Sequence, residues 1–333
     1  MSSDDFQNDP LNKVLLSSSN IGLLKPDDGP ISNSRGAWLT HLTNDYFIPG
    51  ARTLGHSIKR TNSRYPLVLL YTDGLTEEGL NILRDDGVWQ LKHVSNLKNP
   101  NADHYMFQSR LANVYTKCHI YNQTEWDKIV YIDSDIIFLE NSDELFNCPG
   151  YCASFRHSFF NTGVIVAQPN TKFFNDLIEK FPTLPSYNGG EQGLMNAYFW
   201  DFDMKCPLFH DDAETINNFR QNKVNCGRLP SYYNGDIGPY YLHDASWLLP
   251  EQKNAPKILH YTLGAFKPWE WLWYPVFDIC WLWYEMYTDI PGVPASVSKQ
   301  ILNIWVFFGA FFPNLFGWSS FYRQCQKFFE KYC

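Results

Sequence analysis

Two aspartates separated by one residue, Asp133 and Asp135, directly follow the apolar run 128–132. Two carboxylates held this close repel each other unless a cation joins them, so a divalent metal is their natural partner. Carboxylate oxygens suit Mg²⁺ or Mn²⁺, and an imidazole in the same ligand set favours Mn²⁺. His260, which directly follows the apolar run 257–259, is the imidazole candidate. Together these residues predict a metal that bridges a diphosphate and stabilises charge on a leaving nucleotide, whereas each alone also fits a solvated turn or a core histidine.

The acidic pair has to be positioned by a strand that is buried on both faces. The run 128–132 is of that kind, because it is apolar without the alternation of a half-exposed strand. Short apolar runs and helical stretches alternate along the chain, which predicts an α/β fold with a mostly parallel sheet. Ligands bind beyond the carboxyl ends of strands in such sheets, so the aspartates lie where a substrate would bind. We expect strands at 37–42, 67–71, 128–132 and 163–167, and helices at 44–61, 76–86, 105–121, 171–181 and 191–199.

The composition is that of a globular protein with one large domain or two modest ones. The 333 residues are 44% apolar, which excludes disorder, a collagen and a small disulfide scaffold. The net charge is −8 and no run of Lys and Arg occurs, so a nucleic-acid partner is not expected. The eight cysteines show no CxxC pair and no zinc-ligand spacing, and we expect buried or unremarkable thiols. The sequon at Asn122 carries little weight by itself.

Three regions of the chain differ in character. Residues 1–35 are polar and rich in Gly and Pro without periodicity, which indicates a flexible arm and no secretory signal. The α/β catalytic domain is expected to span 36–270. The region 271–333 is Trp-rich, and its run 301–318 carries no charge, close to the about 20 apolar residues that cross a bilayer. We expect this region to associate with a membrane; the alternative is an aromatic helical hairpin packed onto the catalytic domain.

Five blocks of sequence, in their order and spacing, resemble glycosyltransferase family 8, in particular glycogenin and the plant glycogenin-like proteins. The blocks lie at 42–45, 131–135, 160–164, 188–193 and 260–269, and the resemblance covers residues 37 to about 270. It implies a GT-A type fold, with a single Rossmann-like nucleotide-sugar-binding domain. It also implies transfer of a hexose from a UDP-sugar with retention of the anomeric configuration.

The resemblance implies roles for residues near the metal and the nucleotide. Asp133, Asp135 and His260 bind Mn²⁺, with Mg²⁺ as the other candidate. Lys267 neutralises the diphosphate, and Gly264 lets the backbone approach it closely. The other nucleotide-sugar contacts that the resemblance implies are Leu42, Thr43, Asn44, Arg110, Lys117 and Ser134. Read as bare sequence, the three basic residues are also ordinary surface cations, and Asn44 is also a helix N-cap.

Asn161 and the loop 188–192 resemble the parts of these enzymes that hold the donor sugar next to the breaking bond. Glu191 is the carboxylate that a retaining double displacement needs close to the anomeric carbon; same-face attack is the other route to retention. Glycogenin usually has Asp at the positions of Glu191 and Asn188, so the donor preference stays open. The implied donor-sugar contacts are Asn161, Asn188, Gly190 and Gln192, and the implied catalytic residues are Glu191, Gln192 and Lys117.

We expect an Mn²⁺-dependent hexosyltransferase whose donor is UDP-glucose or UDP-glucuronate and whose acceptor is a glycan or a lipid. The segment 182–187 and the block 260–269, followed by Trp-rich segments, look like the plant branch that transfers glucuronate to inositol phosphorylceramide. A lipid acceptor fits a hydrophobic C-terminal region, and an endomembrane location in ER or Golgi follows, with the cytosol as the alternative. Three other functions stay open: a catalytically weak UDP-sugar-binding or scaffold protein, a self-glucosylating primer, and a membrane-anchored interaction protein.

Overall fold

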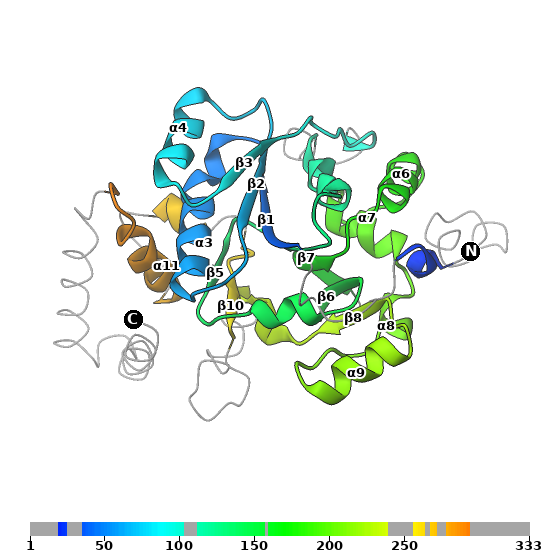
Figure 1. Cartoon of the computed structure of the whole chain (residues 1–333). Coiled ribbons are helices and arrows are strands. Elements are labelled where there is room, and N and C mark those ends of the chain that lie inside the picture. Colours follow the sequence, from blue (N-terminus) through cyan, green and yellow to red (C-terminus); the bar gives the residue numbers. More distant parts are fainter. Residues whose placement is uncertain are drawn as a thin grey trace, which may run out of the picture.

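The computed structural model describes residues 19–24, 35–102, 112–156, 159–238, 256–263, 267–271 and 278–293. A seven-stranded sheet forms its centre (Figure 1), in the order β3 (Gln90–His93), β2 (Leu67–Tyr71), β1 (Gly36–Leu42), β4 (Lys128–Ile132), β7 (Phe159–Ala167), β6 (Tyr151–Arg156) and β8 (Cys226–Leu229). Strands β3, β2, β1 and β4 pair in parallel, as do β6 and β8, and β7 runs antiparallel to both β4 and β6. The predicted mostly parallel sheet is therefore confirmed.

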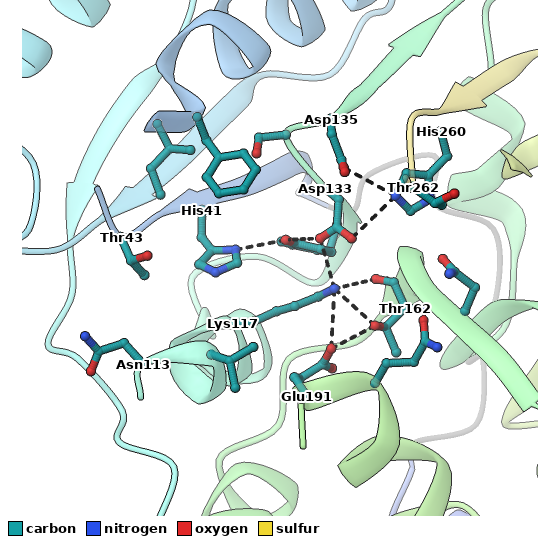
Figure 2. A pocket seen from close by; sticks show the side chains of 18 of the residues that line it. His41, Thr43, Asn113, Lys117, Asp133, Asp135, Thr162, Glu191, His260 and Thr262 are labelled. Carbon is teal, nitrogen blue, oxygen red and sulfur yellow. Dashed lines mark hydrogen bonds and ion pairs between the residues drawn. The ribbon is translucent and has the colours of Figure 1, made fainter. Parts of the chain in front are cut away.

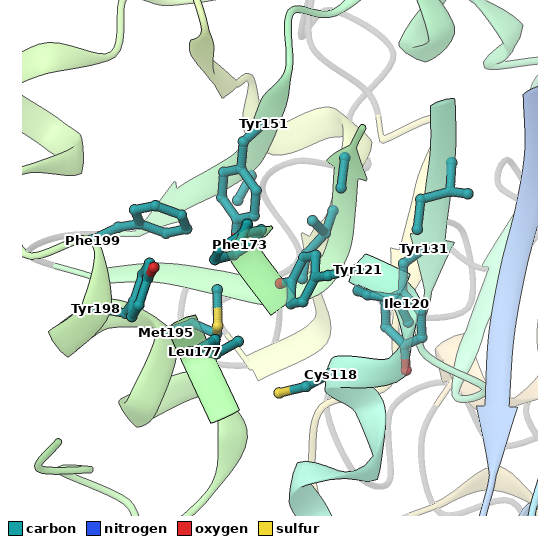
Figure 3. Close-up of a cluster of buried hydrophobic side chains, with 14 of the residues drawn as sticks. Cys118, Ile120, Tyr121, Tyr131, Tyr151, Phe173, Leu177, Met195, Tyr198 and Phe199 are labelled. Carbon is teal, nitrogen blue, oxygen red and sulfur yellow. The ribbon is translucent and has the colours of Figure 1, made fainter. Parts of the chain in front are cut away.

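Helices cover both faces of this sheet. Alternate residues of β4 face opposite sides, so Ile129 and Tyr131 join one apolar cluster while Val130 and Ile132 join the other. The first cluster includes side chains of α6 (Thr171–Lys180) and α7 (Glu191–Tyr198), and Figure 3 shows its aromatic core. The second includes side chains of α3 (Ile48–Arg60) and α4 (Glu77–Asp86). A strand buried on both faces, as the apolar run predicts, is what this arrangement requires.

The helices follow local sequence signals, with two departures from expectation. Gly87, with φ +59°, ends α4 in the left-handed conformation that glycine adopts without strain. The helix expected at 44–61 begins as a short 3₁₀ turn, η2 (Asp45–Phe47), which Asn44 caps, and continues as α3. The helix expected at 105–121 is wrong where the structure describes it, because η4 (Val114–Asn122) is a 3₁₀ helix. Its β-branched and aromatic residues are poor α-helix formers.

A second sheet of three short strands, β5 (Ile136–Phe138), β10 (Ile258–His260) and β9 (Gly235–Asp236), in the order β5-β10-β9, lies beside the metal motif. In the antiparallel pair of β10 and β5, His260 lies opposite Ile136, the residue that follows Asp135. The backbone N–H of Tyr261 donates to the carbonyl of Asp135 at 2.9 Å. The ladder therefore brings two motifs that are 125 residues apart in sequence into direct contact.

Short helices complete the described chain. They are η1 (Asn20–Leu23), η5 (Asp143–Asn147), α8 (Phe202–Lys205), α9 (Ala213–Gln221), η6 (Ser231–Tyr233) and η8 (Pro268–Trp271). The last helix, α11 (Asp278–Thr288), packs against α3 and η8, and its Trp283 is fully buried beside Trp269. Within the described residues no helix has the length and apolar character needed to cross a bilayer. The run 301–318 lies outside the described residues.

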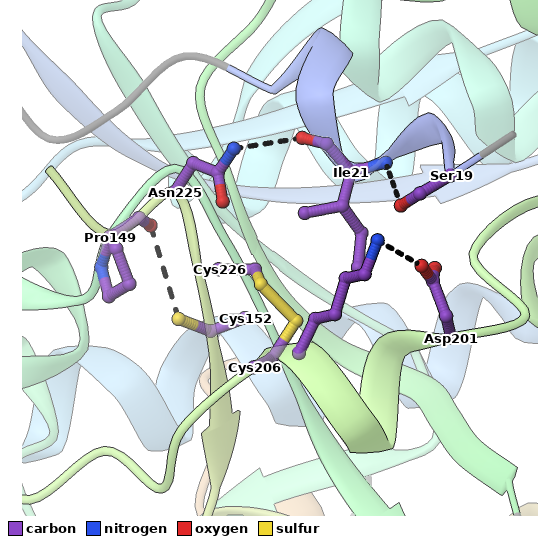
Figure 4. The surroundings of a disulfide bond; sticks show 9 residues. Ser19, Ile21, Pro149, Cys152, Asp201, Cys206, Asn225 and Cys226 are labelled. Carbon is purple, nitrogen blue, oxygen red and sulfur yellow. Dashed lines mark hydrogen bonds and ion pairs between the residues drawn. A yellow bond between two sulfur atoms is a disulfide. The ribbon is translucent and has the colours of Figure 1, made fainter.

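A disulfide joins Cys206, at the end of α8, to Cys226, at the start of β8 (Figure 4). The expectation of unremarkable thiols is wrong for this pair. The two cysteines are 20 residues apart and carry no spacing signature, because only the return of the chain into the sheet brings them together. Three described cysteines, Cys118, Cys148 and Cys152, remain free and are buried, and Cys280 is buried as well.

Candidate active site

A cavity of about 740 Å³ opens at the carboxyl ends of β1 and β4. Figure 2 shows side chains from both sheets, from η4 and from the start of α7 converging on it. Two of the residues implied as nucleotide-sugar contacts, Arg110 and Gly264, lie outside the described residues. The remaining expected residues all line the cavity: Leu42, Thr43, Asn44, Lys117, Asp133, Ser134, Asp135, Asn161, Asn188, Gly190, Glu191, Gln192, His260 and Lys267.

The two aspartates and the histidine of the predicted metal site meet in this cavity. One ligand atom from each of the three lies within 4.8 Å of the others. His260 Nε2 is 3.3 Å from Asp135 Oδ1 and 3.9 Å from Asp133 Oδ2. Two carboxylate oxygens and an imidazole nitrogen are the donor set that Mn²⁺ accepts, and Mg²⁺ takes the oxygens equally well. The residues present therefore fit a divalent cation.

The other oxygen of each aspartate is held by the protein. Asp133 Oδ1 accepts hydrogen bonds from Lys117 Nζ at 3.0 Å and from the Tyr131 hydroxyl at 2.6 Å. Asp135 Oδ2 accepts from Lys267 Nζ, which also donates to the carbonyl of Tyr261. Burial by itself raises the pKa of Asp135, but the positive charge of Lys267 and the contact with His260 outweigh it and hold that pKa well below its ordinary value. Asp135 is thus kept ionised, and each aspartate has one oxygen directed at His260.

Lys117 is buried, 5% exposed, and lies between two carboxylates. Its Nζ is 3.0 Å from Asp133 Oδ1 and 3.4 Å from Glu191 Oε2, and it donates to the carbonyl of Thr162 at 2.6 Å (Figure 2). Burial opposes the charged ammonium, but the two carboxylates outweigh it, so the pKa of Lys117 is raised. The alternative that Lys117 is a surface cation is therefore wrong.

Glu191, at the start of α7, is 3% exposed. Its Oε2 accepts from the Thr162 hydroxyl at 2.8 Å, and its Oε1 is buried without a hydrogen-bond partner among the described residues. Burial raises the pKa of this carboxyl above its ordinary value, although Lys117 and Thr162 pull it down. A buried oxygen with no partner is costly, so Oε1 is the atom of Glu191 available for a contact with a ligand.

Three amide side chains on the cavity wall are fixed by hydrogen bonds. Asn188 Oδ1 accepts from the backbone N–H of Gly190 at 2.9 Å and of Gly193 at 3.1 Å, and from the Ser186 hydroxyl at 3.1 Å. Gln192 accepts from the N–H of Thr162 and donates to the hydroxyl of Tyr187. Asn161 Oδ1 accepts from the N–H of Gly163 and from Asn234 Nδ2, each at 2.8 Å.

The wall on the side of β1 is closed by aromatic rings. Phe47 lines the cavity and meets Trp269 edge to face, with ring centroids 5.6 Å apart. Gly50 allows this packing, because a Cβ there would lie 2.4 Å from the carbonyl oxygen of Ser134 and 2.9 Å from the Trp269 ring. Asn44 uses its side-chain oxygen to accept from the N–H of Tyr46, so the helix-cap alternative for Asn44 is confirmed.

The sequence is similar to those of several characterised proteins. No family model matches the chain. The chain is 39% identical over 241 residues to inositol phosphorylceramide glucuronosyltransferase 1 of Arabidopsis thaliana, covering 72% of this chain and 43% of that protein. It is 29% identical over 238 residues to glycogenin-1 of Caenorhabditis elegans, covering 70% of this chain and 50% of that protein. The chain is related to the glucuronosyltransferases and glycogenins of glycosyltransferase family 8.

Further comparisons agree with this relationship to family 8. A putative UDP-glucuronate:xylan alpha-glucuronosyltransferase 5 of Arabidopsis thaliana is 31% identical over 304 residues, which are 90% of this chain and 46% of that protein. The chain spans about half the length of the curated relatives it matches. Among solved structures, the glycosyltransferase GlyE of Streptococcus pneumoniae aligns with 81% of this chain and 63% of its own, at a TM-score of 0.50 and 20% identity. An active-site variant of LgtC aligns with 78% and 98%, at a TM-score of 0.52 and 12% identity. These likenesses show a GT-A-like fold.

Three side chains in or beside the cavity, His41, Tyr131 and Asn234, are not among the expected site residues. His41 Nδ1 lies 2.8 Å from the Tyr131 hydroxyl, which donates to Asp133. Burial, and secondarily the charge of Lys117, lowers the pKa of His41 to about 4. Asn234 contacts His260 Nδ1 at 2.8 Å. Tyr131 is the one such residue with a local signal, since every second residue of a strand shares a face with the aspartate that follows it.

Proposed function

We propose that the chain is a metal-dependent glycosyltransferase that moves glucuronate from UDP-glucuronate to an acceptor hydroxyl with retention of anomeric configuration. The observation that carries this proposal is the meeting of a three-residue metal site with the buried pair of Lys117 and Glu191 in one cavity. The relationship to glycosyltransferases supports the reaction class. Neither a binding protein nor a self-glucosylating primer is favoured by a feature of the described residues.

Asp133, Asp135 and His260 would hold Mn²⁺, or Mg²⁺ in its place. A cation held there would supply positive charge that stabilises the negative charge on the departing UDP. Lys267 lies on the cavity wall next to Asp135 and supplies a second positive charge to the diphosphate. Leu42, Thr43 and Asn44, beside Phe47, offer the nucleoside a wall at the end of β1.

Glu191 is the proposed nucleophile. Its unpartnered Oε1 would attack the anomeric carbon as the bond to UDP breaks, forming a glycosyl-enzyme ester. The acceptor hydroxyl would then displace the Glu191 carboxylate and pass its proton to a diphosphate oxygen of the departing UDP, so the two inversions give net retention. The ammonium of Lys117 favours the ionised form of Glu191 against the effect of burial, and Thr162 orients its second oxygen. Gln192 and Asn161 flank this position on the cavity wall.

Asn188 supports glucuronate as the donor sugar. A carboxylate at this position would accept the same hydrogen bonds and would suit the start of α7, where negative charge is stabilising. The amide instead places Nδ2, which has no hydrogen-bond partner among the described residues, on the cavity wall. The cavity is lined by four carboxylates and two lysine ammonium groups, and another carboxylate at position 188 would repel the glucuronate carboxylate.

The donor preference can be tested by Asn188→Asp. This change keeps the side-chain oxygen that accepts from the N–H groups of Gly190 and Gly193, and it replaces the NH₂ group with a charged oxygen. We expect the ratio of turnover with UDP-glucuronate to turnover with UDP-glucose to fall by about tenfold, equivalent to about 1.4 kcal/mol. Asn81→Asp, on the exposed face of α4, is the matched control. An unchanged ratio would remove the support that Asn188 gives to glucuronate.

We propose a lipid acceptor and a location facing the lumen of an endomembrane compartment. The relative named as an inositol phosphorylceramide glucuronosyltransferase supports the acceptor class. The disulfide of Cys206 and Cys226 supports an oxidising compartment, because cytosolic thiols are kept reduced. The test is transfer of radiolabelled glucuronate from UDP-glucuronate to vesicles containing inositol phosphorylceramide, compared with xylan oligosaccharides and with no acceptor. Label in the lipid extract supports the lipid acceptor, label in the oligosaccharide replaces it, and label on the protein itself restores the self-glycosylating alternative.

A further inference from the structure

We infer that Asn234 is a positioning residue of the metal site, which fixes the ring of His260 so that only Nε2 is available to a cation. Asn234 lies in the turn between η6 and β9, and its side chain is 6% exposed. This inference rests on the metal site of the proposed function. It concerns the chain's own hydrogen bonds, which exist whether or not a cation is bound.

The hydrogen-bond chain starts from a donor whose identity is certain. The backbone N–H of Gly163 can only donate, so the Asn161 atom 2.8 Å from it is the oxygen Oδ1. Asn234 contacts this same oxygen at 2.8 Å and must do so with its Nδ2, because two acceptors cannot pair. The other amide atom of Asn234, 2.8 Å from His260 Nδ1, is therefore the oxygen.

The ring nitrogen that faces the Asn234 oxygen has to carry a proton. His260 Nδ1 is thus a donor, and Nε2 is the ring atom that faces Asp135 Oδ1 and Asp133 Oδ2 and is left for a cation. Neutral histidine ligands in metal sites are oriented in this way, by a hydrogen bond from the ring nitrogen that does not bind the metal. Without Asn234 the other tautomer would place an N–H group where the cation should bind.

Steric contacts hold the same arrangement. A Cβ at Gly163 would lie 2.2 Å from His260 Cε1, 2.6 Å from Nδ1 and 2.9 Å from Asn161 Oδ1. Only glycine leaves room for the ring at this distance from β7. Asn161 also lines the cavity, and its Nδ2 has no hydrogen-bond partner among the described residues. The residue expected to contact the donor sugar therefore also orients Asn234, which links the donor wall to the metal ligand.

The experiment measures Mn²⁺ affinity by electron paramagnetic resonance titration of the purified chain and two variants. In Asn234→Ala the ring loses its acceptor, and we expect Mn²⁺ to bind 10- to 100-fold more weakly. In Asn234→Asp a carboxylate oxygen still accepts from Nδ1, although the donor to Asn161 Oδ1 is lost, so we expect Mn²⁺ to bind more tightly than in Asn234→Ala. Asn225→Ala, which removes an amide contact to Ile21 remote from the cavity, is the control. Equal Mn²⁺ affinity in Asn234→Ala and the unaltered chain would overturn the inference.

A second measurement needs no variant at position 234 and does not depend on metal binding. Nitrogen-15 NMR of the metal-free chain at pH 8 reports the tautomer of each histidine, and the signals lost in His260→Gln identify His260. We expect Nδ1 of His260 to be protonated. An unprotonated Nδ1 would overturn the inference. If the unaltered chain binds no Mn²⁺ while Nδ1 is protonated, the proposed metal site fails and the role of Asn234 in orienting the ring stands.

Discussion

The ammonium group of Lys117 lies 3.4 Å from Glu191 Oε2, and both groups are almost completely buried. The same ammonium contacts Asp133, a proposed metal ligand, at 3.0 Å. One cation therefore neutralises the group proposed to hold the metal and the group proposed to attack the sugar. The buried charges of Lys117 and Glu191 are tolerable only because they compensate one another, and each becomes costly when its partner is removed.

Replacing Lys117 by Met should destabilise the fold by about 3–5 kcal/mol, because the buried carboxylate of Glu191 and the partly exposed carboxylate of Asp133 would both lose their cation. Adding Glu191→Gln to this variant should recover at least about 1 kcal/mol of the loss, since one of the uncompensated charges disappears. Urea unfolding of the single and double variants measures both numbers. Lys92→Met, whose ion pair with Glu125 is exposed, is the control and should cost less than about 1 kcal/mol. Additive effects of the two substitutions would contradict the coupling.

Glu191→Gln by itself should reduce turnover with UDP-glucuronate by at least about 100-fold, because an amide cannot form the glycosyl ester. Binding of Mn²⁺ and UDP should stay close to that of the unaltered chain, since Glu191 is not among the three metal-site residues. Steady-state kinetics and a UDP titration measure the two properties. Glu78→Gln, on the exposed side of α4, is the matched control. Full activity in Glu191→Gln would assign the reaction to same-face attack without this carboxylate.

His41 should make the fold less stable in mild acid. Its folded-state pKa is about 4, against an ordinary value of 6.5, so the unfolded chain binds more protons between these pH values. The contribution of neutral His41 to the free energy of unfolding is therefore complete above pH 6.5. It is lost as the pH falls towards 4, by on the order of 1–3 kcal/mol. Urea unfolding of the unaltered chain and of His41→Gln at pH 7.5 and pH 4.5 measures this contribution of His41 to stability. Identical pH dependence in the two proteins would contradict it.

The disulfide should add about 3 kcal/mol to the free energy of unfolding, the value for a closed loop of about 20 residues. Cys206→Ser combined with Cys226→Ser should lower it by that amount without changing the cavity, which lies at the other end of the strands. Thermal unfolding with and without a reductant measures the difference. The double variant should be insensitive to the reductant, and a reductant-independent melting temperature in the unaltered chain would mean that the bond does not form.

The parts of the fold that repeat a local pattern are predictable from sequence. The strands at 37–42, 67–71 and 128–132 have apolar runs of the right length, and they agree with β1, β2 and β4. Strands β5, β9 and β10 were not expected, because two or three residues carry no periodicity. The pairing of Cys206 with Cys226 depends on distant segments in the same way.

The same distinction separates the site residues that a sequence motif predicts from those that only the fold brings into place. Asp133, Asp135 and His260 belong to recognisable blocks, and the structure brings them together in one cavity. Lys117 looks like a surface cation in the sequence because its burial depends on η4 packing over β4 and α7. Asn234 carries no signal at all, since its role exists only through the approach of β9 to β10. Residues that act through a neighbour in space, and not through a motif, are those that the sequence leaves out.

The most direct test of the central claim is release of UDP from UDP-glucuronate by the purified chain, with detergent and a lipid acceptor present. The measurement is made with Mn²⁺, with excess chelator, and with Asp135→Ala. The account predicts turnover with Mn²⁺ that is abolished by the chelator and by the substitution. Adding Mn²⁺ back after the chelator should restore the turnover of the unaltered chain. Turnover that persists in Asp135→Ala or in excess chelator would contradict it.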